Sequence, residues 1–98
     1  MSDINEFPHL TPKFPLGEIV GSLNTQEKLG PADVSLALER HGACDWGDVS
    51  PEDSDANDSA LWGGGRLVSV YHDRYGLKFY IITEADRQRT TILLAEDY

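Results

Sequence analysis

The polar and apolar positions of the C-terminal third predict three strands. In the segment RLVSVYH, successive side chains alternate between two faces, which predicts a strand over about 66–72. KFYIITE and TTILLAE are rich in β-branched and aromatic residues and predict strands over about 78–84 and 90–95. The links DRYG and ADRQR are short, so the three strands should form an antiparallel meander.

Two helices are expected before these strands. GPADVSLALERHG predicts a helix over about 31–41, with Pro31 in its first turn and Gly42 just beyond its end. SPEDSDANDSALW predicts a second helix over about 51–62, with Ser50 as N-cap and Pro51 as the first helical residue. Three consecutive glycines, 63–65, should end this helix.

The expected fold class is therefore α+β. A three-stranded antiparallel meander should pack against two or three short helices in two layers, the third being one turn at residues 25–29. Residues 17–98 should form a single domain, and the proline-rich residues 1–16 an extended N-terminal arm. The segment GEIVGSL is compatible with either a short strand or a turn, and its pattern does not decide between them.

Composition narrows the class of partner. The chain has 98 residues, of which 40% are apolar, enough for one thin core, and a net charge of −9. Such a charge repels free nucleic acid and anionic membranes and favours basic protein surfaces. A single cysteine, Cys44, fits a reducing compartment, and no apolar run predicts a signal peptide or a membrane span. We therefore expect a cytoplasmic monomer that binds neither membranes nor nucleic acid directly.

The most distinctive feature is an acidic stretch that contains no cation. No Lys or Arg lies between Arg40 and Arg66, a span that includes Asp45, Asp48, Glu52, Asp53, Asp55 and Asp58. Glu52, Asp55 and Asp58 follow i, i+3, i+6 spacing, and helical neighbours of this kind lie about 5–6 Å apart. Such a row could occupy a groove built for phosphates. The competing interpretation is a solvated helix face whose first acids complement the helix dipole.

No cofactor or metal is expected. Asp53, Asp55 and Asn57 alternate as in a calcium loop, but Asp58 replaces the required glycine and Gly64 the required glutamate. The cysteine and histidines lack the spacing of zinc ligands.

Catalytic residues are not expected either. Cys44 with His41 could be a nucleophile and base, but this pair lacks a third group to orient it. Glu84 and Asp86 lie with Arg87 in the second hairpin turn and could form a polar site. A half-buried thiol and a salt-bridged turn are the simpler interpretations. Trp46 and Trp62 bracket the acidic helix and should pack its ends onto the sheet; an exposed one would be an interface anchor.

Residues 37–98 carry a family resemblance. The matching stretches are DWGD at 45–48, ED at 52–53, ND at 57–58, IITEADR at 81–87, TTILL at 90–94 and EDY at 96–98. They resemble a widespread family of small bacterial and mobile-element proteins, some labelled as restriction-modification subunits. The chain is also similar to small anti-CRISPR proteins active against type I-C systems. This resemblance implies binding to the crRNA-guided surveillance complex and supplies no catalytic residues.

The resulting hypothesis is a stoichiometric inhibitor rather than an enzyme. The carboxylates of residues 45–58 would dock on a basic DNA-binding surface of a CRISPR effector in the bacterial host cell and exclude target DNA. The assignment of these residues to the contact rests on charge. The alternative is an antirestriction or antitoxin-like acidic protein that binds a basic nuclease or toxin. A small hydrolase using Cys44, His41 or the Glu84/Asp86 pair is a third hypothesis.

Overall fold

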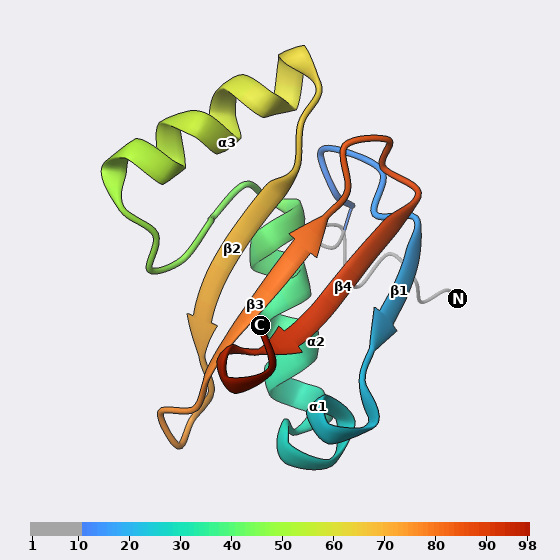
Figure 1. Ribbon diagram of the computed structural model, residues 1–98, viewed down its shortest axis with the longest axis vertical. Coiled ribbons are helices and arrows are strands. Elements are labelled where there is room, and N and C mark those ends of the chain that lie inside the picture. The colour runs from blue at the N-terminus through green and yellow to red at the C-terminus, as the bar shows by residue number, and fades with distance from the viewer. Residues whose placement is uncertain (1–10) are drawn as a thin grey trace, which may run out of the picture.

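A computed structural model describes residues 11–98 of the chain as an α+β domain, so most of the predicted arm, residues 1–10, lies outside the described residues. Its centre is a four-stranded sheet in the order β1-β4-β3-β2 (Figure 1). The strands are β1 (Glu18–Gly21), β2 (Leu67–His72), β3 (Lys78–Thr83) and β4 (Arg89–Leu94). The helices are α1 (Leu23–Lys28), α2 (Pro31–Gly42) and α3 (Pro51–Gly63), and a 3₁₀ turn, η3 (Ala95–Asp97), follows β4.

The meander predicted from the alternating segments is confirmed. β2 pairs antiparallel with β3, and β3 pairs antiparallel with β4. Leu67 lies opposite Thr83, and Ile81 lies opposite Ile92. These side chains point toward α2, so the alternation in sequence corresponds to one covered face of the sheet.

The prediction of a sheet with only three antiparallel strands is wrong, because β1 adds a fourth strand parallel to β4. Glu18 lies in register with Arg89, and Gly21 with Ile92. β1 has four residues, which is too short to show an alternating pattern, and its partner lies some seventy positions later in the sequence. The undecided segment GEIVGSL is thus a strand, set by a long-range pairing that local sequence does not encode.

Both predicted helices are present, but only one covers a face of the sheet. α2 lies across the sheet, whereas α3 lies beyond the outer edge of β2 (Figure 1). Ser50 caps α3, since its Oγ accepts a hydrogen bond from the Asp53 amide at 3.1 Å. The expectation that both helices lie over one face is therefore wrong for α3, in which Asn57 is the buried residue.

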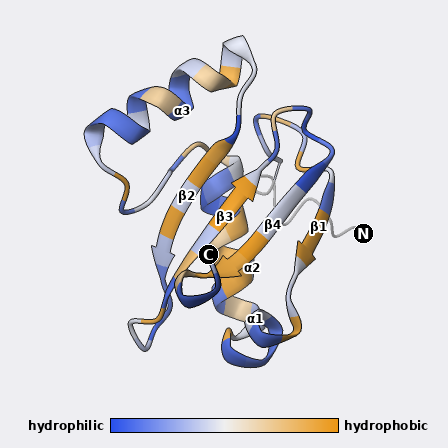
Figure 2. Cartoon of the chain, in the orientation of Figure 1, coloured by the Kyte–Doolittle hydropathy of each residue, from blue (hydrophilic) through white to orange (hydrophobic). Residues whose placement is uncertain are grey.

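Two apolar clusters hold the domain together. The larger fills the space between α2 and the sheet and contains Leu29, Ala37, Tyr71, Phe79, Ile81, Ile92 and Leu94. The smaller joins Phe14, Trp46 and Leu67 to the partly buried Ala60 and Leu61 of α3. The strands are largely hydrophobic and α3 is hydrophilic over much of its length (Figure 2). Within residues 11–98, no helix is long and apolar enough to cross a membrane.

Phe14 places the end of the predicted arm on the domain. Its ring is buried within the smaller cluster, and the neighbouring Lys13 amide donates to the carbonyl of Gly42 at 2.8 Å. Residues 13 and 14 are therefore part of the packed domain rather than of a separate arm.

Candidate acidic binding surface

The position of α3 is fixed by hydrogen bonds to the edge of β2. The Asn57 side chain donates from Nδ2 to the Val68 carbonyl at 2.9 Å, and its Oδ1 accepts from the Val68 amide at 3.1 Å. Two positions along the same edge, the Val70 amide donates to the Trp46 carbonyl, and the Val70 carbonyl accepts from the Asp48 amide. The outer edge of β2 is thereby closed by a side chain and by the segment that precedes α3.

Gly47 is required for the backbone contact between residues 46–48 and Val70. It lies opposite Val70 in a parallel bridge with a φ of +77°. A Cβ atom at this position would lie 2.0 Å from the Val70 carbonyl oxygen, far inside van der Waals contact. The glycine of the DWGD stretch thus allows the close backbone approach that holds the acidic segment against the sheet.

Trp46 anchors the segment that precedes α3 to the core of the domain. Its ring is 4% exposed and packs near Phe14 and His41. Its indole N–H donates to Asp58 Oδ1 at 3.0 Å, so one of the predicted site carboxylates belongs to the connection between Trp46 and α3. Trp46 is buried against the domain, but it contacts α3 at Asp58 rather than at the end of the helix that follows it in sequence.

Asp45 and Asp48 have basic partners that the linear sequence hides. Asp45 accepts two hydrogen bonds from the Arg40 guanidinium, at 2.7 and 3.2 Å, and these hold the pKa of Asp45 below its ordinary value. Asp48 lies 2.9 Å from Nδ1 of His72. The acidic stretch has no cation between its ends in sequence, but the fold brings Arg40 and His72 to two of its six carboxylates.

Glu52, Asp53 and Asp55 have no ion-pair partner among residues 11–98. Glu52 and Asp55 are exposed and lie at least about 140° around the helix axis from Asn57, so they point away from the sheet. Asp53 lies on the other side of α3 and lines a hollow with Arg66 and Val68. Of the predicted stripe, Asp58 accepts the Trp46 indole N–H, whereas Glu52 and Asp55 have neither an ion pair nor a side-chain hydrogen bond in the described part of the chain.

Trp62 extends this outward side. Its side chain is 89% exposed, so the prediction that it packs the end of α3 onto the sheet is wrong. The helical repeat places Trp62 on the same side as Glu52 and Asp55, opposite the buried Asn57. We call Glu52, Asp55, Ser59 and Trp62 the outer face of α3.

Most cations of the chain are engaged away from this face. Five of the eight Lys and Arg residues form ion pairs within residues 11–98. These pairs are Lys28–Glu96, Arg40–Asp45, Arg66–Glu84, Arg74–Asp33 and Arg89–Glu18. Arg87 donates to the backbone carbonyls of Ala60, Gly65, Glu84 and Ala85. Within residues 11–98, no ion pair therefore compensates the charge of the outer face.

His41 lies in a buried hydrogen-bond chain that sequence reasoning missed. Its Nδ1 lies 2.6 Å from Ser69 Oγ, and its Nε2 lies 2.9 Å from Thr83 Oγ1. Thr83 Oγ1 lies 2.7 Å from Thr90 Oγ1, which donates to the Leu16 carbonyl at 2.6 Å. The sequence did carry a signal for this chain: serine and threonine stand at strand positions that face the core. A buried hydroxyl group needs a hydrogen-bond partner, so these positions indicate a buried polar contact.

The direction of this chain follows from its end. A carbonyl only accepts, so Thr90 donates to Leu16, Thr83 donates to Thr90, and His41 must donate to Thr83 from Nε2. Burial, with a smaller contribution from the charge of Arg87, lowers the pKa of His41 to about 4, so the ring is neutral near pH 7 and its Nδ1 accepts from Ser69. His41 is fully buried and both ring nitrogens are engaged, which argues for a structural role.

The catalytic hypotheses gain no support from the geometry of these residues. His41 is committed to hydroxyl groups rather than to Cys44, and burial raises the pKa of the Cys44 thiol, which disfavours the thiolate. Glu84 pairs with Arg66 at 3.5 Å, and Asp86 Oδ1 accepts from the Gln88 amide at 3.0 Å. Among residues 11–98, no group of three or more His, Cys, Asp or Glu side chains is arranged to hold a metal ion.

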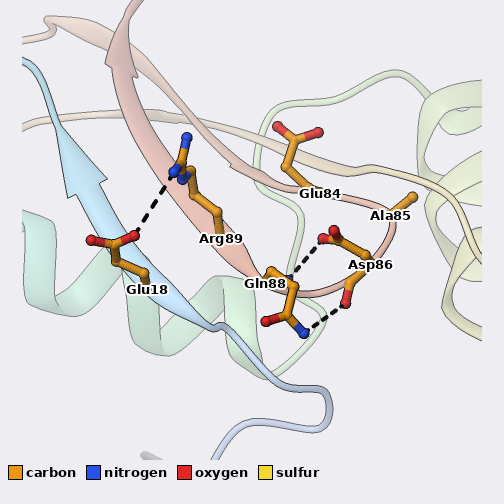
Figure 3. A pocket seen from close by; sticks show the side chains of 6 residues that line it. All are labelled: Glu18, Glu84, Ala85, Asp86, Gln88 and Arg89. Atoms are coloured by element: carbon orange, nitrogen blue, oxygen red, sulfur yellow. Dashed lines mark hydrogen bonds and ion pairs between the residues drawn. The ribbon is translucent and has the colours of Figure 1, made fainter.

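Glu84 and Asp86 instead line an open hollow of about 630 Å³ at the β3–β4 turn (Figure 3). Glu18 and Arg89 face each other on its other side, with 3.9 Å between Oε1 and Nη2.

Comparison with known proteins adds no relative: no protein-family model, curated protein or solved structure matches the chain.

Proposed function

We propose that this protein is a non-catalytic inhibitor that presents the outer face of α3 to a basic, DNA-binding surface of another protein. The observation that carries the proposal is the pair Glu52 and Asp55, exposed and without an ion-pair partner among residues 11–98 while most cations of the chain are engaged elsewhere. Leaving like charges together costs self-repulsion, and a cationic partner would relieve that cost.

The support of α3 suits this role. Asn57 ties the middle of the helix to β2, the Trp46–Asp58 hydrogen bond ties its flank, and Ser50 caps its first turn. A rigid helix loses little conformational entropy on binding, so its carboxylates can replace phosphates at low cost. Trp62 would add an apolar contact beside them.

The resemblance of residues 37–98 directs the proposal to one target. The partner would be the type I-C CRISPR surveillance complex, and binding would exclude target DNA. An antirestriction or antitoxin-like role on a basic nuclease or toxin would use the same outer face. Recovery of the bound partner from host cells separates the two: CRISPR subunits support the first, whereas a nuclease or toxin supports the second.

The sharpest variant is Asp55→Lys, because Asp55 makes no contact that holds the fold among residues 11–98. Asp58 is unsuitable, since its reversal would remove the acceptor of the Trp46 indole. Glu27→Lys is the matched control: it makes the same change in net charge at an exposed position of α1, at the opposite end of the molecule from α3 (Figure 1).

Asp55→Lys should weaken binding to the purified surveillance complex by about tenfold or more, because repulsion replaces attraction at the interface. Glu27→Lys should weaken it by less than about threefold, through net charge alone. Equal losses in the two variants would show that no particular acidic face is recognised. Unchanged binding of Asp55→Lys would contradict the assignment of α3.

A further inference from the structure

The two edges of the sheet differ in a way that points to a second binding surface. The outer edge of β2 is closed, because Val68 and Val70 already have partners in Asn57, Trp46 and Asp48. β1 is the other edge of the sheet and pairs only with β4 among residues 11–98. An open strand edge is a template for another extended segment.

The backbone of β1 offers one central pair of groups. The Glu18 amide donates to the Gln88 carbonyl at 3.0 Å, so Glu18 directs its backbone groups toward β4. Because these directions alternate along a strand, the N–H and C=O of Ile19 point to the free edge. The Gly21 carbonyl is taken by Gln26 Nε2 at 3.0 Å, which limits an added strand to the N-terminal part of β1.

The two sides of this edge differ in chemistry. Ile19 lies on the α2 side, where a groove of about 210 Å³ is lined mainly by apolar residues, including Val34 and Ile92, and the Ile19 side chain is 47% exposed. Glu18 points to the opposite side, beside the hollow lined by Glu84 and Asp86 (Figure 3). Three carboxylates and one guanidinium, that of Arg89, line this hollow.

We propose that the edge of β1 binds an extended segment of a basic partner protein by strand addition. Successive side chains of such a segment point to opposite sides, so a basic residue would face Glu18 while its neighbour, an apolar residue, would face Ile19. A second copy of this chain is a poor occupant, because two molecules of charge −9 repel each other. Pairing of two β1 strands would also bring two Glu18 side chains to the same interface.

The segment thus recognised has alternating basic and apolar residues. The Glu18–Arg89 pair is long, at 3.9 Å, and exposed, so an incoming cation can compete with Arg89 for the Glu18 carboxylate. This surface is separate from the outer face of α3, and its test does not depend on the proposed inhibitory role.

The test uses the full chain and a blocked hexapeptide of alternating arginine and valine, followed by backbone amide NMR. In the free protein the Ile19 amide should exchange rapidly with solvent, whereas the Val20 amide, directed toward β4, should be protected. Peptide should shift and protect the Ile19 amide. A hexapeptide of alternating glutamate and valine should not. An Ile19 amide that is already protected, or shifts confined to other surfaces, would overturn the proposal.

Ile19→Pro removes the outward N–H at the centre of β1, and proline is tolerated on edge strands where that group faces solvent. The variant should bind the peptide about tenfold more weakly. Retained protection of the Val20 and Ile92 amides, which join β1 to β4, would show that the β1–β4 pairing is intact. Glu18→Gln leaves the backbone untouched and should weaken binding about threefold. Unchanged affinity in Glu18→Gln and in a folded Ile19→Pro would contradict strand addition at β1.

Discussion

The side-chain amide of Asn57 pairs with both backbone groups of Val68, as a neighbouring strand would. The two hydrogen bonds measure 2.9 and 3.1 Å, and the asparagine is 5% exposed. One polar side chain thus occupies the edge of β2 at Val68 and fixes the rotation of α3. Because Asn57 faces the sheet, Glu52 and Asp55 must face solvent. The binding surface therefore depends on this buried contact.

Asn57→Ala should lower the free energy of unfolding by about 2–3 kcal/mol, since the Val68 amide and carbonyl both lose their partner. Chemical denaturation measures the change. Ser59→Ala, an exposed position on the same helix, should change stability by less than about 0.5 kcal/mol. If Asn57→Ala is as stable as Ser59→Ala, Asn57 does not hold α3 to the sheet.

The two tryptophans should respond in opposite ways to truncation. Trp46→Ala should cost about 3–5 kcal/mol of stability, because a 4% exposed ring and its bond to Asp58 are lost. Trp62→Ala, which removes an 89% exposed side chain, should leave the unfolding midpoint nearly unchanged and weaken partner binding. A stable Trp46→Ala, or a Trp62→Ala that binds the partner normally, would contradict these assignments.

His41 should make stability depend on pH. The pKa of His41 is about 4 in the folded chain and 6.5 ordinarily, so the unfolded chain binds the proton first as the pH falls. The contribution of the neutral ring is complete above pH 6.5 and is lost progressively between pH 6.5 and pH 4, by about 3 kcal/mol in total.

Denaturation of the native chain and of His41→Gln at several pH values isolates this contribution, because carboxylate effects are common to both. The variant should have the smaller loss between pH 6.5 and pH 4. Nitrogen-15 NMR of the ring should show the proton on Nε2. Parallel stability curves would contradict the lowered pKa of His41. A ring protonated on Nδ1 alone would contradict the direction assigned to the hydrogen-bond chain.

The six carboxylates of the acidic stretch should separate into structural and binding groups. Asp45→Asn should lower stability by no more than about 1 kcal/mol, because its pair with Arg40 is half exposed, and should change partner affinity little. Asp55→Asn should leave stability unchanged and weaken the partner's affinity. Calorimetric titration with the partner and denaturation of each variant measure the two effects. The reverse pattern would place the contact at Asp45.

The sequence was most informative where the pattern was local. Ser50 and Pro51 begin α3 and the glycine run ends it, as predicted. The alternating strand segments form the predicted meander. β1 was missed as a definite strand because its pairing with β4 is long-range. α3 was placed over the sheet because a helix was expected to bury an apolar face, whereas its central contact is the amide of Asn57.

The candidate site was predictable only in part. The spacing of Glu52 and Asp55 placed them on one side of a helix, and the structure leaves both exposed. The neutralisation of Asp45 by Arg40 and the Trp46–Asp58 contact depend on how the loop before α3 folds back. Local spacing could not distinguish these structural carboxylates from the free ones, because all six appear equally acidic in sequence.

The most direct test of the inhibitory role is competition with target DNA on a purified type I-C surveillance complex at low and moderate salt. The account predicts that this protein blocks DNA binding, that its own affinity falls as salt rises, and that Asp55→Lys loses most of the effect. DNA binding that is unaffected at low salt would contradict this target. Inhibition insensitive to both salt and Asp55→Lys would contradict phosphate mimicry by α3.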